Sequence, residues 1–115
     1  MGMRMYVCVG RLDEWIGGYF KYSDDSIYAL LRDNGCDVRD FTGAYNSWVW
    51  KVSGKAFNGV VKKVRSMTAD NLAKYFQDYE VGDDKKEFKR YVLSVLKDFK
   101  RFGSRRDGYY RFIWI

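Results

Sequence analysis

The sequence contains no histidine and no proline, and it has only two cysteines among its 115 residues. The absence of histidine removes the usual general base, the Ser–His and Cys–His nucleophile pairs and the commonest metal ligand. Two thiols alone cannot complete a tetrahedral zinc site. The segments that resemble strands show no acidic pair with the spacing found in metal-dependent nucleases. We therefore expect a protein that is not an enzyme and that uses no metal or other cofactor.

The sequence also lacks a hydrophobic run near the ~20 residues that cross a bilayer. Its first residues do not resemble a secretory signal. We therefore expect a cytoplasmic protein without membrane contact. In that compartment Cys8 and Cys36 are expected to be buried free thiols, and a single disulfide between them is the alternative.

Positive charge is concentrated in the second half of the chain. Residues 1–54 hold six Lys and Arg against seven Asp and Glu, a net charge of −1. Residues 55–115 hold fifteen against eight, a net charge of +7, so the two halves together give the overall +6. Such an asymmetry indicates a polyanionic partner, with nucleic acid as the first choice. The alternative is a basic surface that only keeps the protein soluble.

Two short strands are predicted near the start of the chain. Residues 3–9 alternate, with Met and Val on one side, which is typical of a strand. Because proline is absent, Gly, Asn, Asp and Ser must form the tight turns. Gly17 and Gly18 are therefore predicted to turn the chain into a second strand at residues 19–22.

A helix is predicted over residues 23–33, with Ser23 as its N-cap. Asp24 and Asp25 are interpreted as charges that favour a helix N-terminus rather than as a metal-binding pair. The helix is predicted to stop at Asn34 and Gly35, and its buried side consists of Ile27, Leu30 and Leu31.

The next segment is predicted to be irregular at residues 36–45 and a strand at residues 48–52. The strand places Trp48, Trp50 and Val52 on one side. That side is expected to join the core, and a base-stacking surface is the alternative.

The apolar pattern changes to a helical one after the composition shift at residues 53–55. Residues 55–64 predict an amphipathic helix. Thr68 is predicted to cap a second helix over residues 68–76, and residues 77–84 are predicted to form a loop.

A third helix is predicted from Asp83 and Asp84 to Gly103. Its buried side follows the helical pattern without a gap: Phe88, Tyr91, Val92, Val95, Leu96 and Phe99. Asp107–Gly108 is then the signal of a two-residue hairpin turn of type I′. Residues 109–115 predict an aromatic strand whose core side would consist of Tyr110, Phe112 and Trp114.

Three helices with a short second one, followed by a basic hairpin, resemble the winged helix-turn-helix DNA-binding domain. The stretch TADNLAKYF at residues 68–76 resembles the second helix of that family, residues 89–99 resemble its recognition helix, and residues 103–111 resemble its wing. The resemblance covers about residues 55–115. We expect an α+β fold in one domain of residues 1–115, in which residues 54–115 form a three-helix winged-helix-like part with a β-hairpin wing. Residues 1–53 are expected to be a strand and helix extension of the same domain.

The resemblance implies that the protein binds double-stranded DNA, as a small transcription regulator. Arg90 would contact a base edge in the major groove, because its guanidinium can pair with guanine. The nearby lysines and the start of the second helix would contact the DNA backbone, and the wing arginines would reach the backbone or the minor groove. These residues are Lys85, Lys86, Lys89, Arg105, Arg106, Thr68 and Asn71.

Acidic residues precede the predicted recognition helix and would repel phosphate. Asp83 and Asp84 are explained as charges at a helix N-terminus, whereas Glu80 has no such explanation. Residues 1–53 lie outside the resemblance. They are expected to extend the wing sheet, to form a homodimer contact, or to carry the functional surface themselves.

Two other functions are compatible with the sequence. One is a small protein-binding inhibitor or adaptor of the kind that phages encode, for example against a host nuclease or defence complex. The ten Tyr, eight Phe and four Trp would suit such an interface. The other is a binder of RNA or single-stranded nucleic acid. Its stacking platform would consist of Tyr109, Tyr110, Phe112 and Trp114 beside Arg105, Arg106 and Arg111, although the alternation leaves only Tyr109 outside the core.

Overall fold

The computed structural model describes residues 3–9, 15–21, 23–43, 46–105 and 107–115. In chain order the elements are β1 (Met5–Cys8), β2 (Trp15–Phe20), α1 (Asp24–Asp33), β3 (Val38–Thr42), β4 (Trp48–Ser53), α2 (Gly54–Ser66), α3 (Ala69–Ala73), α4 (Asp78–Val81), α5 (Lys85–Phe102) and β5 (Tyr109–Trp114). The α+β class expected from the sequence is confirmed.

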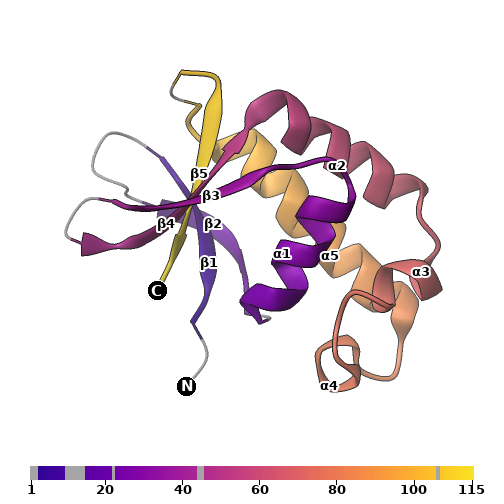
Figure 1. Ribbon diagram of the computed structural model, residues 1–115. Helices are drawn as coiled ribbons and strands as arrows, with labels where there is room; N and C mark the ends of the chain where they lie inside the picture. Colours follow the sequence, from indigo (N-terminus) through magenta and orange to yellow (C-terminus); the bar gives the residue numbers. More distant parts are fainter. Residues whose placement is uncertain (1–2, 10–14, 22, 44–45, 106) are drawn as a thin grey trace.

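The strands form an antiparallel sheet in the order β2-β1-β5-β4-β3. The last strand in the described sequence, β5, therefore lies at the centre of the sheet, while the other strands all come from residues 1–53. The helices lie on one side of the sheet (Figure 1).

The core lies between the sheet and the helices, and aromatic rings fill its centre. Phe112 of β5 lies 5.2 Å from Phe57 of α2 and 5.1 Å from Phe99 of α5, measured between ring centroids. Tyr28 of α1 packs against Trp50 of β4 at 6.0 Å. Burying a phenylalanine side chain stabilises a fold by about 1.5–3 kcal/mol. The predicted core sides of β4 and β5 are confirmed, since Trp50, Val52, Tyr110, Phe112 and Trp114 are buried and Trp48 packs against them.

Side-chain caps begin three of the predicted helices, α1, α3 and α5, where the sequence places them. Ser23 Oγ accepts a hydrogen bond from the Ser26 N–H, and Thr68 Oγ1 accepts one from the Asn71 N–H. Asp84 Oδ1 accepts from the first turn of α5. Each cap satisfies a backbone donor that the helix itself leaves free. The predicted helices at residues 23–33, at 55–64 and from Asp84 to Gly103 are thus confirmed, and α3 is shorter than predicted.

Three local predictions are wrong. Gly17 and Gly18 lie inside β2 instead of forming a turn. A side chain at Gly18 would meet Asp98 Oδ2 of α5 at 3.1 Å, so the close approach of α5 favours glycine there. Residues 38–42 form β3, a polar edge strand without an apolar alternation that could reveal it. Residues 78–81 form the single turn α4, held by a capping box between Gln77 and Glu80.

The Asp107–Gly108 turn forms, but it does not produce a wing hairpin. Both residues have positive φ, 54° and 79°. However, residues 103–105 are not a strand, and β5 pairs with β1 and β4. The turn signal describes only local backbone, whereas the partners of β5 are decided by burial on both of its faces, where Phe112 and Ile113 are each about 2% exposed or less. The winged-helix arrangement is therefore not confirmed.

We predict opposite effects of alanine at two glycines. A Cβ at Gly103 would lie 2.5 Å from the Phe99 carbonyl oxygen and 2.6 Å from Val7 Cγ2, so Gly103→Ala should lower the free energy of unfolding by about 1–3 kcal/mol. Gly59 lies within α2 with nothing within 4 Å of its added Cβ, so Gly59→Ala should raise that free energy by about 0.5–1 kcal/mol. Urea unfolding measures both, and a stabilised Gly103→Ala protein would contradict the packing described above.

Candidate nucleic-acid interface

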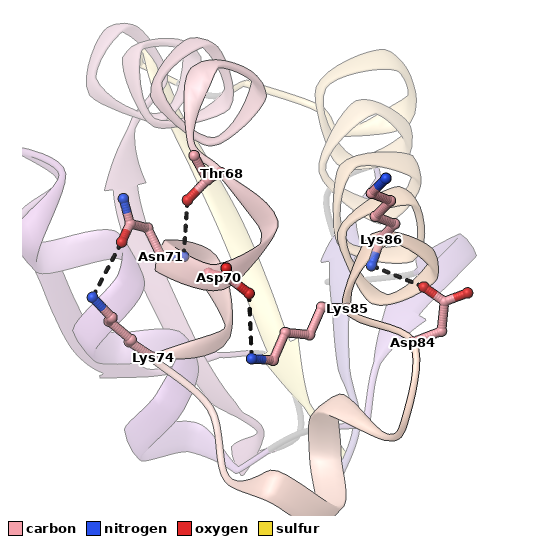
Figure 2. Close-up of polar contacts among 7 residues, drawn as sticks. All are labelled: Thr68, Asp70, Asn71, Lys74, Asp84, Lys85 and Lys86. Atoms are coloured by element: carbon pink, nitrogen blue, oxygen red, sulfur yellow. Dashed lines mark hydrogen bonds and ion pairs between the residues drawn. The ribbon is translucent and has the colours of Figure 1, made fainter.

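The start of α5 carries positive charge that acidic neighbours partly neutralise. Lys85 Nζ lies 3.3 Å from Asp70 Oδ1 of α3, and both side chains are more than half exposed. Lys86 extends away from Asp70, while its backbone N–H donates to Asp84 (Figure 2). The two neighbouring lysines therefore point to different sides of the helix. Only Lys86 leaves its ammonium outside the ion pairs and hydrogen bonds found among the described residues.

The polar groups at the start of α3 are engaged with one another. Thr68 Oγ1 accepts from the Asn71 N–H at 3.1 Å, and Asn71 Oδ1 accepts from Lys74 Nζ at 3.2 Å (Figure 2). Asp70 adds a negative charge to the first turn of α3. Phosphate contacts by Thr68 and Asn71 stay a prediction, and a bound phosphate would compete with these contacts.

Lys89 has a structural position that the sequence did not reveal. Its half-buried side chain donates from Nζ to the carbonyl oxygens of Arg65 and Met67, at the end of α2. Terminal carbonyls of a helix have no partner within the helix, and a lysine there also interacts favourably with the helix dipole. Lys89 therefore joins the end of α2 to the start of α5.

The remaining predicted contacts lie far apart. Arg90 forms an ion pair with Glu87, and both side chains are largely exposed. Arg105 follows the other end of α5, where its guanidinium lies 5.8 Å from the centroid of the Tyr110 ring. An 18-residue helix is about 27 Å long, so Arg105 cannot share a small site with Lys85. Arg106 lies outside the described residues.

Glu80 does have a structural explanation, contrary to the interpretation from sequence. Its Oε2 accepts from the Ser23 N–H at 2.7 Å, and its Oε1 accepts from Ser26 Oγ at 2.9 Å. Oε1 also accepts from the Gln77 N–H at 2.9 Å. These bonds hold α4 against the start of α1. A contact across 57 residues of chain leaves no local sequence signal, which is why the sequence could not show it.

A larger basic surface emerges from the packing of α2 against α5. The two helices are antiparallel neighbours. Lys89, near the start of α5, donates to carbonyls at the end of α2. At the opposite end, the Gly54 N–H at the start of α2 donates to the Gly108 carbonyl, which follows the end of α5. On its other flank, α2 contacts α1, where Lys63 Nζ donates to the Asn34 carbonyl at 3.1 Å. The side of α2 away from α1 therefore borders α5.

We define the basic helical face as seven cationic side chains on these two helices. Positions 55, 58, 62 and 65 share one side of α2 by their spacing of three or four residues, as do positions 86, 89, 93, 97 and 100 of α5. The cations at these positions are exposed, with Lys89 half-buried: Lys55, Lys62, Arg65, Lys86, Lys89, Lys97 and Lys100.

No carboxylate interrupts this face. Helix α2 contains neither Asp nor Glu. The acids of α5 are Glu87, which pairs with Arg90, and Asp98, which lies toward Gly18 of β2. The sequence contained the signal for this face as lysines repeating at helical spacing, but the lateral contact of the two helices was needed to combine them. The arrangement is complementary in charge to a row of phosphates.

Among the described residues, few side chains are suited to covalent or metal chemistry. Cys8 and Cys36 are buried and form no disulfide with each other, as predicted. Burial, with a smaller contribution from Asp37, raises the pKa of the Cys36 thiol to about 11, so this thiol stays protonated at neutral pH. In the described part of the chain, no three Cys, Asp or Glu side chains gather where they could hold a metal ion. No described helix is long and apolar enough to cross a membrane.

We predict that Glu80→Ala lowers the free energy of unfolding by about 2–4 kcal/mol. The substitution removes an acceptor of three hydrogen bonds and leaves the Ser23 and Gln77 N–H groups without a protein partner. Glu87→Ala, which removes an exposed carboxylate, should change that free energy by less than about 1 kcal/mol. Thermal or urea unfolding compares the two, and equal effects would show that Glu80 does not hold α4 in place.

Comparisons of the chain with known protein families, with curated proteins and with solved structures found no match.

Proposed function

We propose that the protein is a non-enzymatic protein that binds double-stranded DNA through the basic helical face. The observation that carries the proposal is the segregation of charge, since two neighbouring helices present seven cations and no carboxylate on one side. Phosphate contacts supply most of the affinity of a protein for duplex DNA. Lysine is a flexible point charge that suits such contacts, and lysine accounts for six of the seven positions.

This mode of binding differs from insertion of the α5 N-terminus into the major groove. The order of α2, α3 and α5 is that of a winged-helix domain, so major-groove reading by Arg90 stays a sequence-based alternative for the same ligand. The acid Asp70 at that end of α5 favours the backbone mode, because it forms an ion pair with Lys85, which would face phosphate in the major groove. Contacts to the backbone position a protein on DNA without reading its sequence.

The test compares two triple variants that each remove three positive charges. One, Lys62→Ala with Lys97→Ala and Lys100→Ala, removes exposed lysines from the basic helical face. The matched control, Lys21→Ala with Arg32→Ala and Lys74→Ala, removes exposed cations elsewhere. Duplex affinity is measured by fluorescence anisotropy over a range of salt concentrations, and thermal unfolding confirms that each variant folds.

We expect the face variant to bind duplex DNA more weakly. Its log–log salt slope should become shallower by about 2–3, because each phosphate contact contributes about 0.9 to the slope. The control should keep the wild-type slope. The proposal would be contradicted by a duplex affinity of the wild-type protein that does not change with salt, or by equal losses of duplex affinity in the two variants.

A second candidate function, a protein-binding adaptor, is favoured by one exposed residue. Tyr79 of α4 is 81% exposed, and tyrosine is a frequent anchor of protein interfaces. It borders an open groove of about 860 Å³ that is also lined by Tyr19 and Tyr91 and by the carboxylates of Glu80, Glu87 and Asp98. Such a groove suits a basic segment of a partner protein.

For this second function we predict that a stoichiometric partner co-purifies with the wild-type protein and is lost in Tyr79→Ala. Tyr28→Ala, which truncates another exposed tyrosine, serves as the control. Size-exclusion chromatography with mass analysis makes the measurement. A monodisperse wild-type protein with no partner would count against the adaptor function.

A further inference from the structure

The face of the sheet opposite the helices carries a second set of aromatic and cationic side chains. Successive residues of a strand point to opposite faces. Since Trp50, Val52, Tyr110 and Phe112 point to the helices, the residues between them point outward. A second, small core cluster of Cys8, Val49 and Ile113 lies on this outer side of the sheet, and Tyr6 packs against it.

Aromatic rings gather at the β1–β2 end of the outer face. The Tyr6 ring lies 5.1 Å from the Tyr19 ring and 5.8 Å from the Trp15 ring, between centroids. Trp15 is 44% exposed. The Arg4 guanidinium lies 5.2 Å from the centroid of the Tyr19 ring. Large rings held at a surface in this way resemble the platforms on which unpaired bases stack.

Cations occupy neighbouring positions on the other strands of the same face. Lys51 of β4 is directly opposite Arg111 of β5 on one side and Arg39 of β3 on the other. Like charges directly opposite each other destabilise a sheet, so an anion bound between Lys51 and Arg39 would stabilise this pair. Lys51 Nζ also lies 4.8 Å from the centroid of the Tyr109 ring, which joins the cation row to another aromatic side chain.

The described strands provide no carboxylate on this face. Their single acid is Asp40 of β3, which is opposite Trp50 and accepts from Trp48 Nε1 at 3.0 Å, so it belongs to the helical side. Positive charge beside rings, on described strands that direct no carboxylate to this face, is complementary to a strand that offers phosphates and unpaired bases. A duplex would present its phosphates but keep its bases stacked on one another and closed to the rings.

We infer that the outer face of the sheet binds single-stranded nucleic acid, with bases stacking on Trp15, Tyr6 and Tyr19 and phosphates bound by Arg39 and Lys51. Trp15 and Arg39 are the exposed members on the two edge strands, β2 and β3. Neighbouring strands are about 4.8 Å apart, so β2 and β3 lie roughly 19 Å from each other across the five described strands. This surface is separate from the basic helical face, and the inference does not rest on the proposed function.

The test measures binding of labelled oligothymidylate and oligouridylate of about 15 nucleotides, a length within the site sizes of single-strand binders. A hairpin duplex is measured in parallel. The double variant Trp15→Leu with Arg39→Ala should lose roughly 5- to 150-fold in affinity for the single strands, the range expected when one stacked base is lost. It should bind the hairpin as the wild type does. Trp15→Phe, which keeps a ring, should retain most of the affinity.

Tryptophan fluorescence gives a second readout, because Trp48, Trp50 and Trp114 belong to the helical side and Trp15 to the outer face. A stacked base should quench the Trp15 emission, and the quenching should be absent in Trp15→Leu. Unchanged single-strand affinity in the folded double variant would overturn the inference, as would a parallel loss for single strand and hairpin. The Lys62, Lys97 and Lys100 triple variant should lose affinity for the hairpin and keep its affinity for the single strands. The experiment therefore distinguishes failure of the helical-face proposal from failure of the outer-face inference.

Discussion

The ring of Phe112 lies between Phe57 of α2 and Phe99 of α5, and this contact determines how the two longest helices lie on the sheet. Because both helices pack on the same residue of the central strand, they must lie side by side. The Lys89 bonds at one end and the Gly54–Gly108 bond at the other then define their antiparallel direction. The basic helical face, with its six lysines and Arg65, is a consequence of this packing.

The amphipathic helices could be predicted from the sequence because their information is local. The apolar positions of α5 from Phe88 to Phe99 and the caps at Ser23, Thr68 and Asp84 lie within a few residues of the structure they determine. The same reasoning found β1, β4 and β5 from their alternation or their aromatic content.

Features that depend on distant contacts could not be predicted in this way. The polar edge strand β3 is stabilised mainly by its pairing with β4. The glycine at position 18 is explained only by the close approach of α5. The position of β5 could not be read from the Asp107–Gly108 turn, since that signal specifies two residues and not the partner of the strand that follows. For the candidate site, the sequence showed the lysines but not that Lys85 pairs with Asp70 or that Lys89 bonds α2.

Charge and aromatic residues are distributed between two faces with different chemistry. The positions that define the basic helical face hold cations and no aromatic residue. The outer face of the sheet instead combines cations with Trp15 and three tyrosines. Net charge alone suggested a single basic surface in the second half of the chain. The sheet also places Arg39 and Lys51 of the first half beside Arg111 of β5, and Arg4 lies against the Tyr19 ring on the same face.

The central position of β5 has a consequence for the order of folding. The β1–β2 and β3–β4 pairs can form from neighbouring segments, but they meet only through a strand that is synthesised after all of them. Until β5 inserts, each pair exposes an edge with unpaired backbone groups, which is a state prone to wrong pairing. Pairing of β5 with β1 also closes a loop of more than 100 residues, and contacts of such high sequence separation slow folding. The chain is therefore expected to become fully protected against aggregation late, when the strand that joins its two halves is in place.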